Sequence, residues 1–155
     1  MNSRLWMRVC VWAVAVFSLV AVWLLLYNPG VLESPNQVCF HGRCLNVEVV
    51  QNETDRTRGL QHRKTLGENA GMLFVFSDIQ KYSFWMKDTF IPLDMIWLDY
   101  AKRVVHVERN VPPCRQDPCP TYAPSAPALY VLETNPDQFD VKRGDQLEFR
   151  LNVIR

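Results

Sequence analysis

The stretch FWMKDTFIPLDMIWLDY, residues 84–100, decides how this sequence folds. Pro92 has no N–H to give to a strand ladder, so the run divides into two strands joined by an extended or turned segment. In the second strand Asp94 shares a face with Ile96 and Leu98, and both faces are largely apolar, so its carboxylate is predicted to be at least partly buried. A buried carboxylate is costly unless a cation or several N–H groups satisfy it. The stretch therefore predicts a β-rich core that contains either a paired internal charge or a binding site.

Strand-like segments occupy most of the chain around this stretch. They are short, rich in aromatic and β-branched residues, and separated by turn residues. They are residues 45–51, 72–76, 82–87, 93–99, 103–109, 129–134 and 146–154. One short helix is expected after Asn52, which can cap it, with Asp55 three residues later and Gly59 near its end. The predicted fold is mainly β: a compact β-sandwich or barrel-like domain with one short helix.

The N-terminal part of the chain contains a long apolar run, VCVWAVAVFSLVAVWLLLY, at residues 9–27. As a helix it spans about 28 Å, close to the hydrocarbon thickness of about 30 Å. Arg4 and Arg8 precede the run, so the positive-inside rule places residues 1–8 in the cytoplasm. A cleaved signal peptide is the alternative, but its apolar region is shorter and ends in small residues, whereas this run ends in WLLLY. We expect a single transmembrane helix that stays in the lipid bilayer and exports the rest of the chain.

The organisation after this run is simple. Residues 28–37, NPGVLESPNQ, are rich in Pro, Gly and small polar residues and are expected to link the helix to an exported domain at residues 38–155. The 155-residue chain is 48% hydrophobic and 21% charged, with a formal net charge of +1, which is ordinary for one globular domain. Its basic residues are scattered rather than clustered or interleaved with aromatic residues, so nucleic acid is not an expected partner.

Four of the five cysteines form two C-x4-C pairs in the predicted exported domain. The pairs are Cys39 with Cys44 in CFHGRC, and Cys114 with Cys119 in CRQDPC. A two-residue turn at residues 41–42 would bring the first pair together with Cα atoms about 4.5 Å apart, within disulfide range. Spacing alone leaves three pairings open, and a four-cysteine zinc site is the alternative. An oxidising compartment favours disulfides, so we expect disulfides, no metal, and a domain on the periplasmic or outer side of the membrane.

Five motifs within residues 43–153 form a recognisable pattern. They are N-x-x-D-R-x-R-G-L-x-x-R (52–63), G-M-L-F-V-F (71–76), F-W-M-K-D-T-x-I-P-L-D-M-I (84–96), P-C-x-x-D-P-C-P (113–120) and Y-V-L-E (130–133). Together they resemble the uncharacterised domain-of-unknown-function 192 family. The resemblance implies a small β-rich domain of sandwich or jelly-roll type with a short helix, often exported behind a signal or anchor, and it implies no established activity. Gln61 stands where the family usually has Met, and Asp88 stands where it usually has Asn.

The matched motifs contain charged residues that could accompany Asp94, and two interpretations follow. In the structural one, Asp94 pairs with Arg56 or ties down the loop that precedes its own strand. In the functional one, the residues form a small polar pocket. Its members are Arg56 and Lys87 as donors, Asp94 and Glu133 as acceptors, and Trp85 as an apolar wall.

Two functional hypotheses remain open at this point. No Ser, Cys or Thr has the sequence context of a catalytic nucleophile, and no two histidines share a ligand spacing such as H-x-x-x-H, so no cofactor is expected. The preferred hypothesis is a membrane-anchored, non-enzymatic extracytoplasmic module that binds a ligand or a membrane-protein partner, for example as a subunit of a membrane assembly. The alternative is an envelope hydrolase that acts on cell-wall or polysaccharide material with Asp94 and Glu133 as paired carboxylates.

Overall fold

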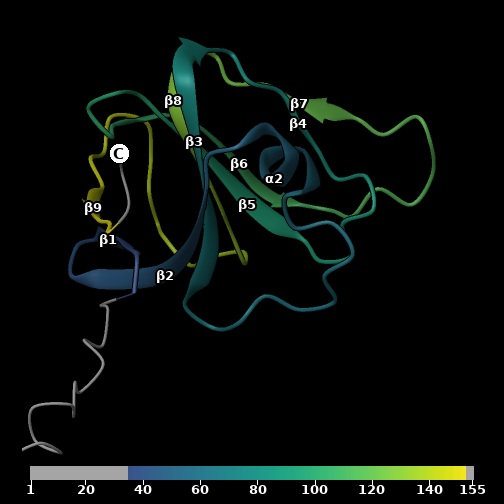
Figure 1. Cartoon of the computed structure of the whole chain (residues 1–155), viewed down its shortest axis with the longest axis horizontal. Coiled ribbons are helices and arrows are strands. Elements are labelled where there is room, and N and C mark those ends of the chain that lie inside the picture. Colours follow the sequence, from purple (N-terminus) through teal and green to yellow (C-terminus); the bar gives the residue numbers. More distant parts are fainter. Residues whose placement is uncertain (1–34, 153–155) are drawn as a thin grey trace, which may run out of the picture. The chain divides into compact units, whose positions relative to one another are not determined.

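The computed structural model of the chain describes residues 35–152 (Figure 1). They belong to a compact unit that begins at Pro35. The predicted cytoplasmic segment 1–8, the predicted transmembrane helix 9–27 and most of the predicted linker 28–37 lie outside the described residues. Within residues 35–152, the structure contains no helix that is long and apolar enough to cross a membrane.

The described part of the chain is built from strands and one short helix, which confirms the prediction of a mainly β domain. The helix is α2 (Glu53–Arg58). The strands are β1 (Gln37–Phe40), β2 (Arg43–Val50), β3 (Ala70–Gln80), β4 (Phe84–Trp85), β5 (Leu93–Leu98), β6 (Val104–Val111), β7 (Thr121–Tyr122), β8 (Ala128–Thr134) and β9 (Glu148–Arg150). Two predicted strands are shorter than expected: 82–87 contains only the two residues of β4, and the described part of 146–154, which ends at residue 152, contains only the three residues of β9.

Seven strands form one mixed sheet in the order β6-β5-β8-β3-β2-β1-β9, and β4 pairs separately with β7. The neighbours in the large sheet are antiparallel except β2 and β3, which run parallel. A parallel pair needs a crossover connection, and the segment that contains α2 provides it. The start of β6 also bonds to the segment before β9: Val104 N–H donates to the Asp145 carbonyl at 2.8 Å, and Leu147 N–H donates to the Lys102 carbonyl at 3.0 Å. The sheet therefore closes on itself, as in a barrel.

Two hydrophobic cores cover the two faces of this sheet, because side chains along each strand alternate between faces. The inner core lies inside the closed sheet and consists of Val38, Leu45, Val47, Leu73, Ile96, Leu98, Val104, Leu132, Phe139, Val141 and Leu147. The outer core lies on the opposite face and consists of Leu60, Met72, Phe74, Met86, Leu93, Met95, Trp97, Val111, Ala128 and Val131. All of β5 is buried, since both of its faces are covered.

Both cysteine pairs are joined locally. Cys39 lies opposite Cys44 in the β1–β2 hairpin and is bonded to it, with a Cα–Cα distance of 4.0 Å. The turn between them has positive φ at both central residues, His41 and Gly42, as a two-residue hairpin turn requires. The second disulfide joins Cys114 to Cys119. These bonds resolve the three open pairings, leave no thiolates for a four-cysteine zinc site, and indicate an oxidising environment.

Candidate functional site

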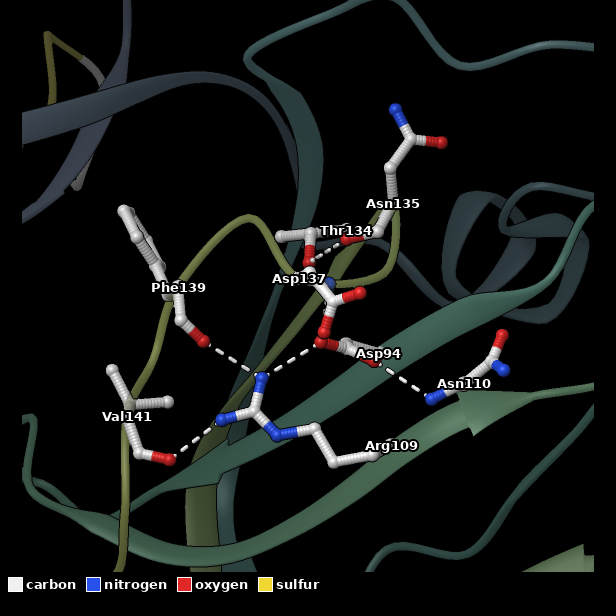
Figure 2. Close-up of polar contacts among 8 residues, drawn as sticks. All are labelled: Asp94, Arg109, Asn110, Thr134, Asn135, Asp137, Phe139 and Val141. Carbon is white, nitrogen blue, oxygen red and sulfur yellow. Dashed lines mark hydrogen bonds and ion pairs between the residues drawn. The ribbon is translucent and has the colours of Figure 1, made fainter.

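Asp94 lies on β5 and is almost completely buried, with 1% of its surface exposed. Its Oδ2 atom accepts a hydrogen bond from Arg109 Nη1 at 2.7 Å and another from the Asp137 N–H at 3.1 Å, and its Oδ1 atom accepts from the Asn110 N–H at 2.7 Å (Figure 2). A cation and two backbone donors therefore satisfy the carboxylate, as its burial demands. The predicted partner Arg56 is wrong, because the neighbouring strand β6 supplies Arg109 instead, and none of the three donors belongs to the loop before β5.

Arg109 extends this network to the segment that follows β8. Its Nη1 atom also donates to the Phe139 carbonyl at 2.7 Å, and its Nη2 atom donates to the Val141 carbonyl at 2.6 Å (Figure 2). Phe139 and Val141 belong to the inner core. The Asp94–Arg109 pair thus fastens β5 and β6 to the segment that closes this core, and its hydrogen-bonding capacity is used within the fold.

A pocket of about 300 Å³, here called the α2 pocket, lies between α2 and the outer face of the sheet. Three of the five predicted site residues line it: Arg56 from α2, Trp85 from β4 and Glu133 from β8. The other lining residues are Glu53, Thr57, Arg58, Gly59, Leu60, Gln61, Phe74, Phe76, Tyr82, Ser83, Phe84 and Thr89. The pocket therefore combines aromatic side chains with a few polar groups, the usual composition of a small-molecule site.

Glu133 is the buried polar group of this pocket. Only 4% of its surface is exposed, and it lies opposite Met72 on one neighbouring strand and Met95 on the other. No hydrogen bond or ion pair joins its carboxyl to another residue among those described. Burial raises the pKa of Glu133 from 4.5 to about 8, because the charged form loses its hydration. At neutral pH the pocket therefore contains a protonated carboxyl, which can donate one hydrogen bond and accept others.

Aromatic rings form the walls around this carboxyl. Phe76 stacks on Tyr82 with ring centroids 3.5 Å apart, and Phe74 meets Phe84 edge to face at 4.9 Å. Such contacts stabilise fixed ring orientations beyond the burial of their surfaces. β3 and the segment that follows it up to β4 bring these four rings to one pocket.

Arg56 lies at the pocket with its charge already engaged. The Nη1 atom donates to the Gln51 carbonyl and, at 3.3 Å, to the Val75 carbonyl. The guanidinium also lies over the Phe76 ring, 5.1 Å from its centroid, which is a favourable cation–π distance. Arg56 therefore fastens α2 to β3 and covers one aromatic wall of the pocket.

Lys87 does not line the α2 pocket, so its predicted role there is wrong. Its Nζ atom pairs with Asp117 Oδ2 at 3.2 Å and lies 5.8 Å from the centroid of the Trp85 ring. Asp117 belongs to the loop closed by the Cys114–Cys119 disulfide. Lys87 thus points toward this loop rather than into the pocket.

The end of α2 shapes the mouth of the pocket. Asn52 caps the helix by accepting from the Asp55 N–H at 2.8 Å, as predicted. Gly59 ends the helix with φ +47°, and a Cβ atom there would lie 3.3 Å from Phe74 Cζ. Glycine suits this position because it adopts positive φ without strain and leaves the neighbouring ring its space.

The two departures from the family pattern have different consequences. Gln61 lines the α2 pocket, and its Nε2 atom donates to the Thr57 carbonyl at 3.3 Å. Asp88 has φ +55°, and its carbonyl accepts from the His62 N–H at 2.7 Å. Asn and Asp both tolerate this left-handed conformation, so Asp88 preserves the turn that an Asn would form.

The two carboxylates proposed as a catalytic pair face opposite sides of the sheet. Across β5 and β8, Asp94 lies opposite Thr134, whereas Glu133 lies opposite Met95. Side chains one residue apart on a strand point to opposite faces, so Asp94 belongs with the inner core and Glu133 with the outer one. They cannot act together on one glycosidic bond. Among residues 35–152, no three His, Cys, Asp or Glu side chains cluster as metal ligands would.

Comparisons with known proteins agree with this fold. The model of the domain-of-unknown-function 192 family, described as "Uncharacterized ACR", matches residues 36–149. Two solved structures are each 29% identical to this chain over 74% of its length, with a TM-score of 0.65. One is a protein of unknown function from Novosphingobium aromaticivorans, of which 83% is covered; the other is described as a proposed transcription regulator from Sinorhizobium meliloti, of which 91% is covered. No curated protein matches the sequence.

Proposed function

The chain belongs to the domain-of-unknown-function 192 family, and from this premise we propose that its β domain is a non-enzymatic extracytoplasmic binding module whose ligand site is the α2 pocket. One observation carries the proposal: Glu133 is buried in the pocket with no partner among the described residues.

Among residues 35–152, no side-chain oxygen or nitrogen atom that is closed to solvent lacks a hydrogen bond. The Glu133 carboxyl oxygens therefore reach the pocket, where only water or a ligand can satisfy them. The same sheet satisfies Asp94 completely, so the sequence is able to provide partners where stability requires them. The Glu133 carboxyl has no protein partner, and it faces a cavity large enough for a small molecule. A bound ligand that hydrogen-bonds to this carboxyl would supply what the fold leaves out.

The proposal includes the placement of the domain in the cell. Residues 9–27 hold the chain in the membrane as a single span with the N-terminus in the cytoplasm, and residues 38–155 lie on the exported side. The apolar run with its preceding arginines and the two disulfides support this topology. A membrane-protein partner is the corresponding class of macromolecule for an anchored binding module.

The geometry gives no matching support to the hydrolase alternative. Glycosidases use two carboxyl groups that flank one bond, about 5–10 Å apart. Asp94 is engaged by Arg109 on the inner face of the sheet, and Glu133 lies on the outer face. No specific observation favours catalysis over binding in the α2 pocket.

Native mass spectrometry of the full-length chain, purified from its own membranes, tests the binding function. The informative variant is Thr57→Trp, which places a large ring at the pocket, and its matched control is Thr54→Trp on the same exposed helix surface but outside the pocket lining. We expect a small-molecule adduct on the wild type and on Thr54→Trp, and none on Thr57→Trp. If all three are adduct-free, and a small-molecule extract of the host raises the melting temperature of none of them, the proposal fails.

Thiol labelling tests the topology separately. In intact cells, an impermeant maleimide should label the partly exposed Cys44, Cys114 and Cys119 only after an external reductant has opened the disulfides that they form with Cys39 and with each other. Labelling without reduction, or protection that persists after it, would contradict an exported and oxidised domain.

A further inference from the structure

We propose that the α2 pocket binds an uncharged, ring-sized ligand that carries an amide group, and that this amide exchanges two hydrogen bonds with the Glu133 carboxyl. The inference rests on the proposed binding function and names the chemical class of its ligand. It is built from the buried carboxyl, the ring walls and the charges that surround the pocket.

The carboxyl defines the polar part of the ligand. Glu133 is nine-tenths buried, lines the pocket and has no partner among the described residues. A protonated carboxyl presents an O–H donor beside a carbonyl acceptor. A primary amide presents an N–H donor beside a carbonyl acceptor with the same planar spacing, so the two groups can form a pair of parallel hydrogen bonds. A ligand with an acceptor alone, or a donor alone, would leave one of these positions unsatisfied.

The walls define the apolar part. Phe74, Phe76, Tyr82, Phe84 and Trp85 all line the pocket. Offset-stacked and edge-to-face contacts are favourable between such rings and a planar ligand. A volume of about 300 Å³ is at the small end of ligand pockets, which fits a single ring with a short substituent.

The surrounding charges argue against a charged ligand. The acidic and basic side chains that line the pocket are Glu53, Arg56 and Arg58 from α2 and Glu133 from β8. The lining residues of β3, β4 and the turn after α2 are uncharged. A cationic ligand would need an open aromatic face for a cation–π contact. Arg56 already covers the face of Phe76, so its guanidinium would repel such a ligand there. An anionic ligand would find no free counter-charge, because Arg56 is engaged by two backbone carbonyls and Arg58 pairs with Asp55.

The protonation state of Glu133 gives the inference a measurable signature. Because burial raises the pKa of Glu133 to about 8, the carboxyl that donates to an amide is present at neutral pH and is lost at high pH. Affinity for an amide should therefore fall above pH 8. Affinity for a cation should rise over the same range, since ionised Glu133 would then attract it.

Fluorine NMR with three matched probes tests this prediction on the full-length chain in nanodiscs. The probes are 4-fluorobenzamide, 4-fluorobenzyltrimethylammonium and 4-fluorobenzoate, which share one ring and differ in charge. We expect the benzamide to bind most tightly at about pH 6 and about 30-fold more weakly at about pH 9.5, the ratio that a pKa of about 8 implies. Glu133→Gln should retain binding at both pH values, since its amide donates and accepts but does not titrate. Thr57→Trp should bind no probe.

Four results would overturn the inference. Preferential binding of the ammonium probe, with affinity that rises with pH, would assign the site to cations. Loss of benzamide binding in Glu133→Gln, with an unchanged melting temperature, would remove the proposed hydrogen-bond pair. A wild type that carries a host molecule in mass spectrometry but binds none of the probes would overturn the ligand class while the binding function stands. A wild type that matches Thr57→Trp in both experiments would remove the binding function as well.

Discussion

The two faces of the sheet treat a buried carboxyl in opposite ways. On the inner face, Asp94 receives hydrogen bonds from Arg109 and from the backbone of Asn110 and Asp137. On the outer face, Glu133 is nearly as buried and has no such partner among the described residues. The two side chains lie on adjacent strands, one residue apart in register.

This difference distinguishes a carboxyl group that stabilises the fold from one that is available to bind a ligand. Around the Asp94 carboxylate, one guanidinium and two backbone N–H groups take the place of water. Glu133 lacks such donors, so it becomes neutral at physiological pH. Burial alone therefore does not tell whether a carboxyl serves the fold or a ligand, whereas the count of its partners does.

The largest effect is expected from Asp94→Ala. Removal of this carboxylate leaves the Arg109 guanidinium without its ion partner and two backbone N–H groups without an acceptor. Loss of one partner of a buried pair costs about 3–5 kcal/mol. Arg109 is 36% exposed, so water can hydrate part of its charge, and urea denaturation at neutral pH should show a decrease of about 3 kcal/mol in the free energy of unfolding. An unchanged unfolding midpoint would mean that Asp94 does not serve the fold, and the contrast with Glu133 would disappear.

The next effect concerns the pH dependence of stability, which Glu133 should control. Its pKa is about 8 in the folded chain and near the ordinary value of 4.5 when unfolded. Between these values the unfolded state releases a proton that the folded state keeps, so the stabilising contribution of protonated Glu133 is full below pH 4.5 and is lost as pH rises through 8. The Gln side chain of the Glu133→Gln variant has no proton to lose in this range, so the variant keeps this contribution at high pH. At pH 9 we expect the variant to be more stable than the wild type by about 2–3 kcal/mol, because water entering the open pocket limits the full penalty of ionisation.

Thermal melts of both proteins from pH 4 to pH 9 check this prediction. The two stability curves should coincide near pH 4 and separate as pH rises. Curves that run parallel over the whole range would show that Glu133 titrates normally. In that case the outer face would contain a solvated carboxylate like any other, and the comparison with Asp94 would lose its basis.

Local features of the fold could be predicted from the sequence because they depend on neighbouring residues. Asn52 lies before a helical segment, and its side chain caps that helix. His41 and Gly42 lie between two cysteines, and positive φ at both closes the hairpin that the disulfide joins. The alternation that places Asp94 on the face of Ile96 could also be read directly, since both residues share one strand.

The grouping of site residues could not be predicted in the same way, because it depends on the register between distant strands. A shift of one residue between β5 and β8 would have placed Asp94 and Glu133 on the same face. Arg109 was missed although a signal exists: the predicted strands 93–99 and 103–109 form a hairpin, which brings the start of one beside the end of the other. Matched family motifs drew attention to Arg56 instead, whose charge is engaged by Phe76 and two carbonyls.

A smaller effect is expected from removal of the second disulfide. The Cys114–Cys119 bond closes a short loop, and Cys114 packs against the outer core. Loop entropy for a ring of this length predicts a loss of about 2 kcal/mol in the double variant Cys114→Ser/Cys119→Ser. Chemical denaturation without reductant measures it against the wild type, because a reductant would also open the Cys39–Cys44 disulfide. If the loss equals that of Asp94→Ala, the loop would be as important to the domain as the inner ion pair.

The smallest effect should come from Lys87→Ala, and it sharpens the contrast between exposed and buried charges. Lys87 pairs with Asp117 at 3.2 Å, but their side chains are 39% and 68% exposed, so water and salt screen the attraction. Exposed pairs contribute about 0–1 kcal/mol, and we expect about 0.5 kcal/mol or less here.

A double-mutant cycle with Asp117→Ala isolates the pair from the contact of Lys87 with the Trp85 ring. The coupling should shrink further in high salt, whereas the Asp94–Arg109 coupling should change little. A salt-resistant coupling above about 1 kcal/mol at Lys87 would show that solvent exposure does not distinguish the two ion pairs, and that the fold relies on this outer charge as it does on Asp94.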